Sequence, residues 1–526
     1  MNTPLTLQRI EEILHNRIKD DQFTTLKTIP RPTEFKDMQK ATQRIVEAIN
    51  NYETINLVGD YDVDGVVSTT IVVEFFSKIG IDINYIIPNR FEHGYGLSPI
   101  ILDQIYDGIV ITVDNGISAI EAANICKQRG LDLIITDHHT LSKQLPDAFA
   151  IINPKQIDCP FPFKDICGAQ VAWYLCASIK NALKIEYNLM EFFDLLALAI
   201  VADIMPMVSL NQTMVKKGLK VLENSNRPAI VALKERYALR DINEEDIGFK
   251  IAPLINCAGR MNDPLIALEF LLSFDKHEAL YQLDYLIELN EQRKQQQLKM
   301  FEEAKVCVDE TDNVIVVASE TWNEGIIGIV ASKLCEKYKK PSIVFSIDGK
   351  VAKASCRSTP DVDLYELINS CSSLLNGFGG HKQAAGLSID SDKINQFKLQ
   401  LLENIKSFQK SEKNNTNSLG EFCISLVGFD IYNLIESYRP YGITNPYPVF
   451  TFKNLEVIGV QKIGKNKEYS KLIVSNGYET MEMLVFVDLE EINMGQKINC
   501  IAQIAKNYFR NETTYNLMLK ELLPEQ

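Results

Sequence analysis

The stretch Ile55-Asn56-Leu57-Val58-Gly59-Asp60-Tyr61-Asp62-Val63-Asp64-Gly65 passes from a short apolar run into a turn that carries three aspartates. A strand that ends in carboxylates costs free energy unless the charges meet a cation or water. Asp62 and Asp64 are two residues apart, so on an extended segment their side chains point the same way. The stretch therefore predicts a buried strand with an acidic site at its carboxyl end.

The same pattern recurs before residue 204. Val113-Asp114-Asn115-Gly116 follows one apolar run, Asp137-His138-His139 follows another, and Asp203 closes a third that begins at Leu195. A ligand set of carboxylates with one imidazole is typical of Mn²⁺ or Mg²⁺ rather than of a sulfur-rich zinc site. Two such ions close together could activate water against a phosphorus centre. The residues that we expect to hold the metal are Asp62, Asp64, Asp114, His138 and Asp203.

A plainer interpretation is that each aspartate caps a helix or forms a turn. One Asp-Gly pair favours that alternative, whereas the full ordered set favours a metal site. We expect Asp62 and Asp114 to serve catalysis, and the role of Asp60 stays open. If His138 binds metal, His139 points elsewhere on an extended chain, where it could stabilise charge at phosphorus or protonate the leaving oxygen.

Short apolar runs alternate with helical stretches between residues 54 and 154. Nearly continuous apolar strands in such an alternation predict an α/β fold with a parallel, doubly wound sheet. Ligands of these sheets bind beyond the carboxyl ends of the strands, where three of the acidic motifs fall. The expected strands are 55–58, 83–87, 109–113, 131–135 and 150–152, and the expected helices include 66–79 and 118–129.

The whole chain is too long for one core. A charged helix, 286–306, is expected to connect the first lobe to a second α/β lobe, and the polar segment 411–418 to act as a linker. Short strands and turns after it predict a small β-barrel. The expected domains are an N-terminal helical segment 1–50, a catalytic domain 51–240, a helical connector 241–311, a second lobe 312–410 and the barrel 419–526.

Further motifs complete a resemblance to the DHH phosphoesterase superfamily. The Gly59 to Gly65 form is similar to that of the RecJ family, the bacterial single-strand-specific 5′→3′ exonucleases. This resemblance implies that the second lobe is a DHH-associated substrate-binding domain and that the barrel is an OB-fold. The additional motifs are Arg90-Phe91-Glu92-His93-Gly94-Tyr95-Gly96, Asn256-Cys257-Ala258-Gly259-Arg260, Gly325-Ile326-Ile327-Gly328-Ile329-Val330-Ala331-Ser332 and Gly379-Gly380-His381-Lys382-Gln383-Ala384-Ala385-Gly386.

The resemblance also implies a site for a 5′-phosphate. It assigns Ser355 and Arg357 to the terminal phosphate and places His381 against substrate phosphate, while Arg90 and Arg260 are candidate phosphate clamps by their place in the motifs. Structural ion pairs are the alternative for the arginines, and a turn with a core histidine is the alternative for Gly-Gly-His. The chain departs from the family at Cys356, where Gly is usual, and at Asn323 and Tyr469, where His is common.

A net charge of −15 argues against a protein coated for duplex DNA. An enzyme that threads one strand needs only a local basic groove. Two clusters in the barrel mix cations with aromatic side chains, which suits base stacking, although solvated turns are an equal alternative. They are Lys462, Lys465, Lys467, Tyr469 and Lys471, and Tyr508, Phe509 and Arg510.

The 11 scattered cysteines contain no Cys-x-x-Cys, which fits reduced thiols in a cytosol. The sequence shows no apolar run long enough to cross a membrane and no signal peptide, so a cytoplasmic location is expected. No P-loop is present, so no nucleoside triphosphate is expected to be needed. A RecQ-type helicase and a single-strand-binding protein are candidate partners by resemblance, and a monomer is expected.

The leading interpretation is a metal-dependent 5′→3′ exonuclease that hydrolyses single-stranded DNA to 5′-mononucleotides in DNA repair and recombination. One alternative is a DHH phosphodiesterase that acts on short oligonucleotides or small phosphate substrates. The barrel argues against it, because such enzymes resemble only the two α/β lobes. A non-enzymatic DNA-binding replisome scaffold is the third interpretation, and the intact acidic and histidine motifs argue against it.

Overall fold

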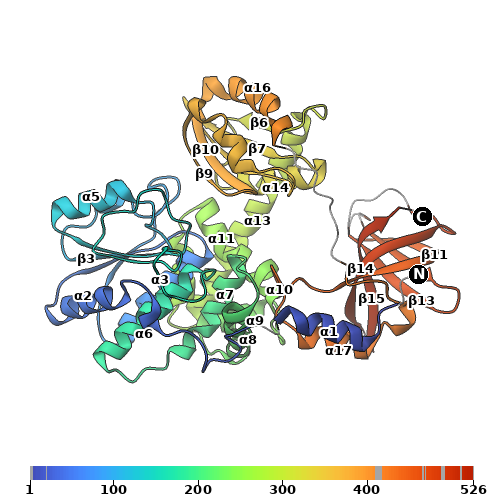
Figure 1. The fold of residues 1–526 in the computed structure, drawn as a ribbon, viewed down its shortest axis with the longest axis horizontal. Helices are drawn as coiled ribbons and strands as arrows, with labels where there is room; N and C mark the ends of the chain where they lie inside the picture. Colours follow the sequence, from blue (N-terminus) through green and yellow to red (C-terminus); the bar gives the residue numbers. More distant parts are fainter. Residues whose placement is uncertain are drawn as a thin grey trace. The chain divides into compact units, whose positions relative to one another are not determined.

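The computed structural model describes residues 4–18, 21–408, 418–464, 467, 469–486, 492–509 and 512–524. The chain forms two compact units (Figure 1). One contains Arg31–Asp203 and Gly218–Lys413, and the other contains Met1–Pro30, Ile204–Lys217 and Asn414–Gln526. The first unit holds both α/β lobes, and the second holds the barrel. In the described part of the chain, no helix is both long and apolar enough to cross a membrane.

The first lobe is built on a five-stranded parallel sheet in the order β2-β1-β3-β4-β5. The three central strands are almost completely buried, which is why their sequences read as continuous apolar runs. The expected parallel sheet is therefore confirmed, with an edge strand β2 that is shorter than predicted. The strands are β1 (Ile55–Val58), β2 (Asn84–Ile86), β3 (Ile109–Val113), β4 (Asp132–Thr136) and β5 (Ala150–Ile152).

Helix α3 (Val63–Lys78) begins three residues before the predicted start. Asp62 is its N-cap and accepts a hydrogen bond of 3.1 Å from the amide of Gly65. Asp64 consequently lies on the first helical turn, so the expectation that Asp62 and Asp64 share an extended segment is wrong. The capping interpretation holds for Asp62, but it occupies only one carboxylate oxygen and leaves the other for a different partner.

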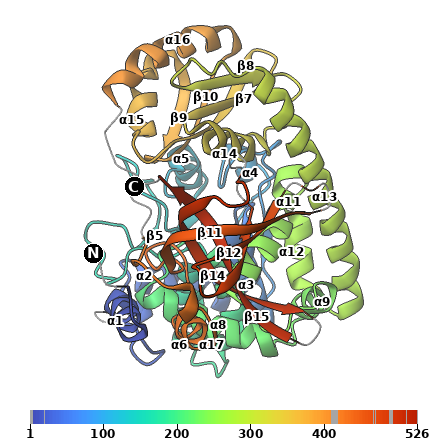
Figure 2. The same cartoon turned by 90° about the vertical axis from the view of Figure 1, so that its right-hand side faces the viewer.

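Helices complete the first lobe and connect it to the second. The long helix α13 (Lys276–Val306) starts ten residues earlier than predicted, because Asp275 caps it by accepting from two backbone amides. It packs against α9, α11 and α12 of the first lobe and against α14 of the second (Figure 2). The other helices here are α2 (Met38–Asn50), α5 (Ile120–Arg129), α6 (Gly168–Leu183), α7 (Phe193–Ala202), α9 (Pro228–Arg236), α11 (Ala252–Met261) and α12 (Leu265–Leu272). Helix α8 (Ser209–Asn224) is divided between the two compact units.

The second lobe has a mixed sheet in the order β6-β7-β8-β10-β9, in which only β6 and β7 are parallel. Its strand β8 alternates in burial, so Ala352, Ala354 and Cys356 enter the core and the intervening residues face the other side. The elements are β6 (Ile315–Ser319), α14 (Ile327–Tyr338), β7 (Ser342–Asp348), β8 (Val351–Arg357), α15 (Leu364–Asn369), β9 (Leu375–Gly380), β10 (Ala384–Asp390) and α16 (Ile394–Asn404).

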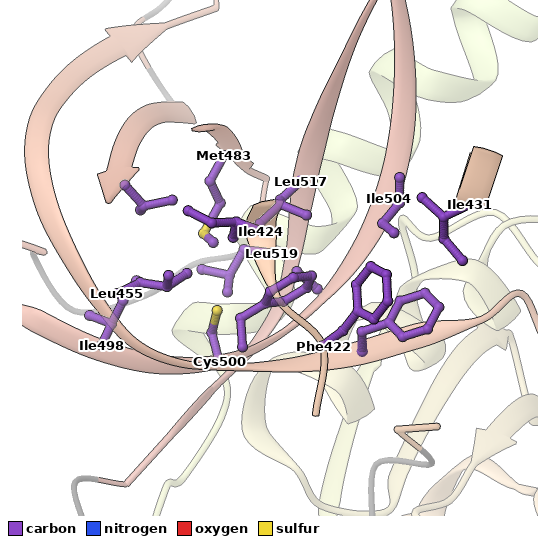
Figure 3. Close-up of a cluster of buried hydrophobic side chains, with 14 of the residues drawn as sticks. Phe422, Ile424, Ile431, Leu455, Met483, Ile498, Cys500, Ile504, Leu517 and Leu519 are labelled. Carbon is purple, nitrogen blue, oxygen red and sulfur yellow. The ribbon is translucent and has the colours of Figure 1, made fainter. Parts of the chain in front are cut away.

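The predicted barrel is present as a closed sheet in the order β11-β12-β13-β15-β14. Figure 3 shows its buried core, which includes Phe422, Leu455, Met483 and Leu517. The strands and adjoining helices are β11 (Val449–Ile463), β12 (Tyr469–Ser475), β13 (Thr480–Val485), β14 (Lys497–Phe509), β15 (Glu512–Leu523), α1 (Leu7–Ile18) and α17 (Phe429–Ser437).

The segment expected as one N-terminal unit is divided between the two compact units. Ile10 and Leu14 of α1 join the barrel core, and the amide of Leu5 donates to the carbonyl of Glu421. Helix α2 instead packs against α6 and β5. Of the other sequence-based expectations, linker residues 411–417, Lys465, Arg510 and the side chain of Phe509 lie outside the described residues.

Candidate metal centre and anion cavity

The five expected metal-binding side chains converge at the carboxyl end of the first sheet. His138 follows β4, and its Nε2 lies 3.2 Å from Oδ1 of Asp114, which follows β3. The same nitrogen lies 3.6 Å from Oδ2 of Asp64 and 3.6 Å from Oδ2 of Asp203, the C-cap of α7. We call Asp62, Asp64, Asp114, His138 and Asp203 the metal cluster.

Candidate ligand atoms form adjacent groups within this cluster. Those of Asp64, His138 and Asp203 all lie within 4.8 Å of one another. A second group joins Asp60, Asp62 and Asp114 within the same limit, which brings in a residue whose role the sequence left open. Because the two groups draw on different residues, the geometry offers more than one place for a cation.

The electrostatics of the cluster favour a bound cation. Burial raises the pKa of Asp203 to about 9, with further contributions from Asp64 and Asp62. Burial, followed by the neighbouring carboxylates, also raises the pKa of Asp114 well above its ordinary value. Burial lowers the pKa of His138 to about 4. The raised pKa values of the two aspartates reflect burial and then crowded carboxylates, whose charge a divalent ion would offset.

Three buried polar atoms of the cluster lack a hydrogen-bond partner among the described residues: Oδ1 of Asp114, Nδ1 of His138 and Oδ2 of Asp203. Buried polar atoms are normally satisfied, so atoms left without a described partner on three residues of one cluster call for an explanation. Carboxylate oxygens with one imidazole match the donor set that Mn²⁺ and Mg²⁺ accept. The residues present therefore fit a divalent metal.

The N-terminus of α6 contributes a contact that sequence analysis missed. The amides of Gly168 and Ala169 donate hydrogen bonds of 2.6 and 2.8 Å to the two carboxylate oxygens of Asp64. A Cβ on Gly168 would lie 2.4 Å from Oδ1 of Asp114, so only glycine allows this approach. Gly168 is more than 100 residues from Asp64 and belongs to no acidic motif, which is why spacing gave no signal.

His139 is held differently from His138. Oδ1 of Asp137 accepts from the amides of both histidines and lies 2.8 Å from Nδ1 of His139. Burial alone would lower the pKa of His139, but the hydrogen bond to Asp137 and nearby carboxylates raise it to about 9. One ring nitrogen of His139 also lies within 4.8 Å of ligand atoms from Asp114 and His138. Asp137 therefore orients the ring beside the metal cluster.

A cavity of about 610 Å³ lies next to the cluster, and we call it the anion cavity. Four of the five predicted phosphate-binding residues line it: Arg90, Arg260, Ser355 and Arg357. Asp60 and Asp62 flank Tyr61, which also lines the cavity. Tyr95 provides a second connection, since its ring is edge-on to those of Tyr61 and His139 and its hydroxyl lies 3.4 Å from the carbonyl of Asp114.

The three arginines of the anion cavity make no ion pair with a carboxylate among the described residues. Arg90 instead stacks over Tyr61 at 4.3 Å, and its Nε is buried without a partner. Arg260 donates to the carbonyl of Gly325, and burial followed by Arg90 lowers its pKa to about 10. Arg357 donates to Oγ of Ser355 at 3.2 Å. Among the described residues these guanidinium groups therefore lack the carboxylate ion pairs that the structural alternative required.

The remaining predicted residue, His381, does not line the anion cavity. Its Nε2 lies 3.1 Å from Oγ1 of Thr140, the residue after His139. The departures from the family pattern also have clear positions. Cys356 points into the core of the second lobe, and Oδ1 of Asn323 accepts from the amide of Gly325 just before α14. Tyr469 lies in the barrel with its ring edge-on to Phe486 at 5.1 Å.

Comparison with known proteins matches each part of the chain. Residues 54–200 match the N-terminal domain of the DHH family, residues 311–407 the DHHA1 domain and residues 420–521 the RecJ OB domain. The single-stranded-DNA-specific exonuclease RecJ of Haemophilus influenzae is 31% identical over 90% of this chain and 87% of its own length. RecJ of Bacillus subtilis is 33% identical over 93% of this chain, which spans 64% of that relative's length.

Solved structures agree on the fold. RecJ from Thermus thermophilus, crystallised in complex with Mn²⁺, aligns with a TM-score of 0.85 at 24% identity, covering 99% of this chain and 76% of its own. A second exonuclease RecJ, bound to manganese, aligns with a TM-score of 0.63 at 29% identity, covering 71% of this chain and 95% of its own. The expected fold is confirmed, from the parallel-sheet lobe and second α/β lobe to an OB-fold barrel.

Proposed function

The chain belongs to the RecJ family of single-stranded-DNA-specific exonucleases, and we propose that it is itself a metal-dependent 5′→3′ exonuclease that hydrolyses single-stranded DNA to 5′-mononucleotides. Relatives are named single-stranded-DNA-specific exonuclease RecJ, and this chain has a metal cluster and an anion cavity side by side. The alternatives of a small-substrate phosphodiesterase and a non-enzymatic scaffold are not favoured by these matches.

Mn²⁺ or Mg²⁺ is the proposed cofactor, with Asp62, Asp64, Asp114, His138 and Asp203 as its ligands. The donor set, the unpaired buried atoms and the crystallised relatives with either ion support this assignment. Two ions are proposed because candidate ligand atoms fall in adjacent groups. When bound, such ions polarise a phosphoryl oxygen and lower the pKa of water toward neutrality.

The protein's own groups position the reaction. The α6 amides fix Asp64, and Asp137 fixes His139. His139, charged through its hydrogen bond with Asp137, can stabilise negative charge that develops on the phosphoryl oxygens or give a proton to the leaving 3′-oxygen. Asp62 and Asp114 contribute to catalysis by holding the metal in place.

The anion cavity explains direction and end preference under this proposal. Arg90, Arg260, Ser355 and Arg357 would bind the terminal 5′-phosphate through charge-assisted hydrogen bonds, which are the stronger kind. His381 would contact a phosphate from its position beside Thr140. A fixed 5′ end beside the metal cluster determines how far along the strand the cut falls, so the product is a mononucleotide.

One observation carries the proposal: arginines with no carboxylate partner among the described residues line a cavity that shares Tyr61 and Tyr95 with the surroundings of the carboxylate cluster. The test offers the protein three substrates of one sequence in Mn²⁺: a linear 5′-phosphorylated strand, a blunt duplex and a closed single-stranded circle. We expect mononucleotides from the linear strand alone. Efficient cutting of the circle would contradict end recognition, because a circle has no 5′ end.

The wider setting is part of the same proposal. We propose residues 51–240 as the catalytic domain, 312–410 as the substrate-binding domain and 419–526 as a further nucleic-acid-binding domain, joined by the connector 241–311. We propose that the protein is a monomer that works in the cytoplasm in DNA repair and recombination. A RecQ-type helicase and a single-strand-binding protein are its proposed partners, and both fit a single-strand substrate. We propose that the reaction needs no nucleoside triphosphate.

A further inference from the structure

Two residues that line the anion cavity form an ion pair with each other. Nζ of Lys353 lies 3.0 Å from both carboxylate oxygens of Glu324, and both residues line the cavity. Among the described residues that line it, Glu324 alone carries a carboxylate. A negative charge in a pocket for phosphate opposes the ligand, so its presence there requires a reason.

The sheet beneath the cavity extends past the proposed phosphate contacts. Lys353 precedes Ser355 and Arg357 on the same face of β8. Across the sheet, Gly386 pairs with Ser355 and Gly379, so little side-chain volume stands over this row. A Cβ on Gly379 would meet nothing within 4 Å, and one on Gly386 would meet only a carbonyl at 3.7 Å. Shape alone therefore does not close the cavity between Ser355 and Lys353.

Charge, in contrast, limits which ligand can occupy the part of the cavity between Ser355 and Lys353. Within the described part of the chain, Arg90, Arg260 and Arg357 have no carboxylate partner, whereas the charge of Lys353 is already matched by Glu324. A second or third phosphate that reached this pair would find Lys353 already matched and would have to compete with the Glu324 carboxylate for it. Specificity of this kind comes from repelling the wrong ligand as much as from attracting the right one.

We infer that Glu324, held by Lys353, is a specificity-determining residue that limits the anion cavity to a 5′-monophosphate and rejects a 5′-triphosphate. The inference rests on the proposed function. It also sets a place in a reaction sequence: the preferred substrate comes from a reaction that leaves a 5′-monophosphate, such as hydrolysis of an internal phosphodiester bond or of a terminal triphosphate.

The discrimination acts on the first cleavage only. Each hydrolysis adds water across a phosphodiester bond, breaks the bond from phosphorus to the 3′-oxygen, and leaves the hydroxyl on the released nucleotide. The shortened strand then carries a 5′-phosphate whatever the first end was. The experiment therefore measures the single-turnover rate of the first cut on strands of one sequence that begin with a monophosphate or a triphosphate.

Wild type should cut the monophosphate strand about tenfold faster or more, because juxtaposed like charges are strongly unfavourable. Glu324→Gln should lower the ratio of the monophosphate rate to the triphosphate rate. Lys353→Met, which leaves Glu324 without its cationic partner, should raise this ratio. The controls are Glu320→Gln and Lys350→Met, whose side chains are exposed and lie outside the cavity lining, and they should leave the ratio unchanged.

Equal wild-type rates on the two ends would overturn the inference, and so would a shift in the same direction for Glu324→Gln and Lys353→Met, since a purely structural ion pair predicts that result. These outcomes leave the proposed exonuclease intact, because the monophosphate strand is still degraded. Failure of wild type to degrade that strand in Mn²⁺ or Mg²⁺ would instead contradict the proposed function itself.

Discussion

Nε2 of His138 lies 3.2 Å from Oδ1 of Asp114, and that oxygen is buried with no hydrogen-bond partner among the described residues. The ends of the neighbouring strands β3 and β4 thus bring an imidazole and a carboxylate together in a site that needs a cation. Burial and like charges raise the pKa of Asp114, so the metal-free cluster is electrostatically unfavourable.

Asp114→Asn should remove metal-dependent stabilisation. For wild type, Mn²⁺ at 100 times its dissociation constant should add about 2.7 kcal/mol to the free energy of unfolding. The variant should lose most of this gain and all detectable cleavage, while its metal-free melting temperature equals or exceeds that of wild type because a buried charge is gone. Asp107→Asn, at an exposed position, is the control. The measurement is the melting temperature of each protein with EDTA and with Mn²⁺. If Mn²⁺ raises the melting temperature of Asp114→Asn as much as that of wild type, Asp114 is not a metal ligand.

Gly168→Ala should damage both the fold and the site. The added methyl would overlap Oδ1 of Asp114, and overpacking of this kind costs about 1–3 kcal/mol. We expect a lower melting temperature together with weaker Mn²⁺ binding. Gly248→Ala is the matched control, since its Cβ would first meet a side-chain carbon at 3.9 Å. Equal behaviour of the two variants would show that the close approach at Gly168 is unimportant.

His139→Gln should separate catalysis from metal binding. Loss of a positioned general acid typically reduces turnover about 10²–10⁴-fold. Because Asp137 holds His139 and the carboxylate cluster surrounds Nε2 of His138, only His138→Gln should also weaken Mn²⁺ binding. Calorimetric titration with Mn²⁺ and turnover assays on both variants provide the measurement. If both variants lose metal affinity to the same degree, the two histidines do not have separate roles.

Arg357→Ala should erase most of the preference for a 5′-phosphate. A hydrogen bond to a charged group contributes about 1.5–3 kcal/mol, so the ratio of rates on 5′-phosphate and 5′-hydroxyl strands should fall by roughly tenfold or more. Metal-induced stabilisation should persist, because Arg357 lies in the other lobe. Arg240→Ala, on the exposed surface, is the control. An unchanged ratio in Arg357→Ala would place the terminal phosphate elsewhere.

The sequence predicted those features that depend on local pattern. Continuous apolar runs identified β1, β3 and β4, and the acidic residues after them were correctly expected to meet because parallel strands end at one edge. It missed the local cap by which Asp62 starts the helix that contains Asp64. It also failed where tertiary contacts decide, since the α6 amides reach Asp64 from a distant part of the chain.

The same limit applies outside the metal cluster. Nothing in the spacing of α1 indicates that Ile10 and Leu14 complete the barrel core. The residues assigned to phosphate by resemblance converge except for His381, whose partner Thr140 belongs to the first lobe. Periodicity predicts elements and their faces, whereas the neighbours of a given side chain depend on how the whole chain folds.

The most direct test of the account follows one single-stranded oligonucleotide labelled at its 5′ end in one sample and at its 3′ end in another, with Mn²⁺, Mg²⁺ or EDTA. A metal-dependent 5′→3′ exonuclease should release the 5′ label at once as a mononucleotide while the 3′-labelled strand shortens step by step, and EDTA should stop both. Release of the 3′ label first, or full activity in EDTA, would contradict it.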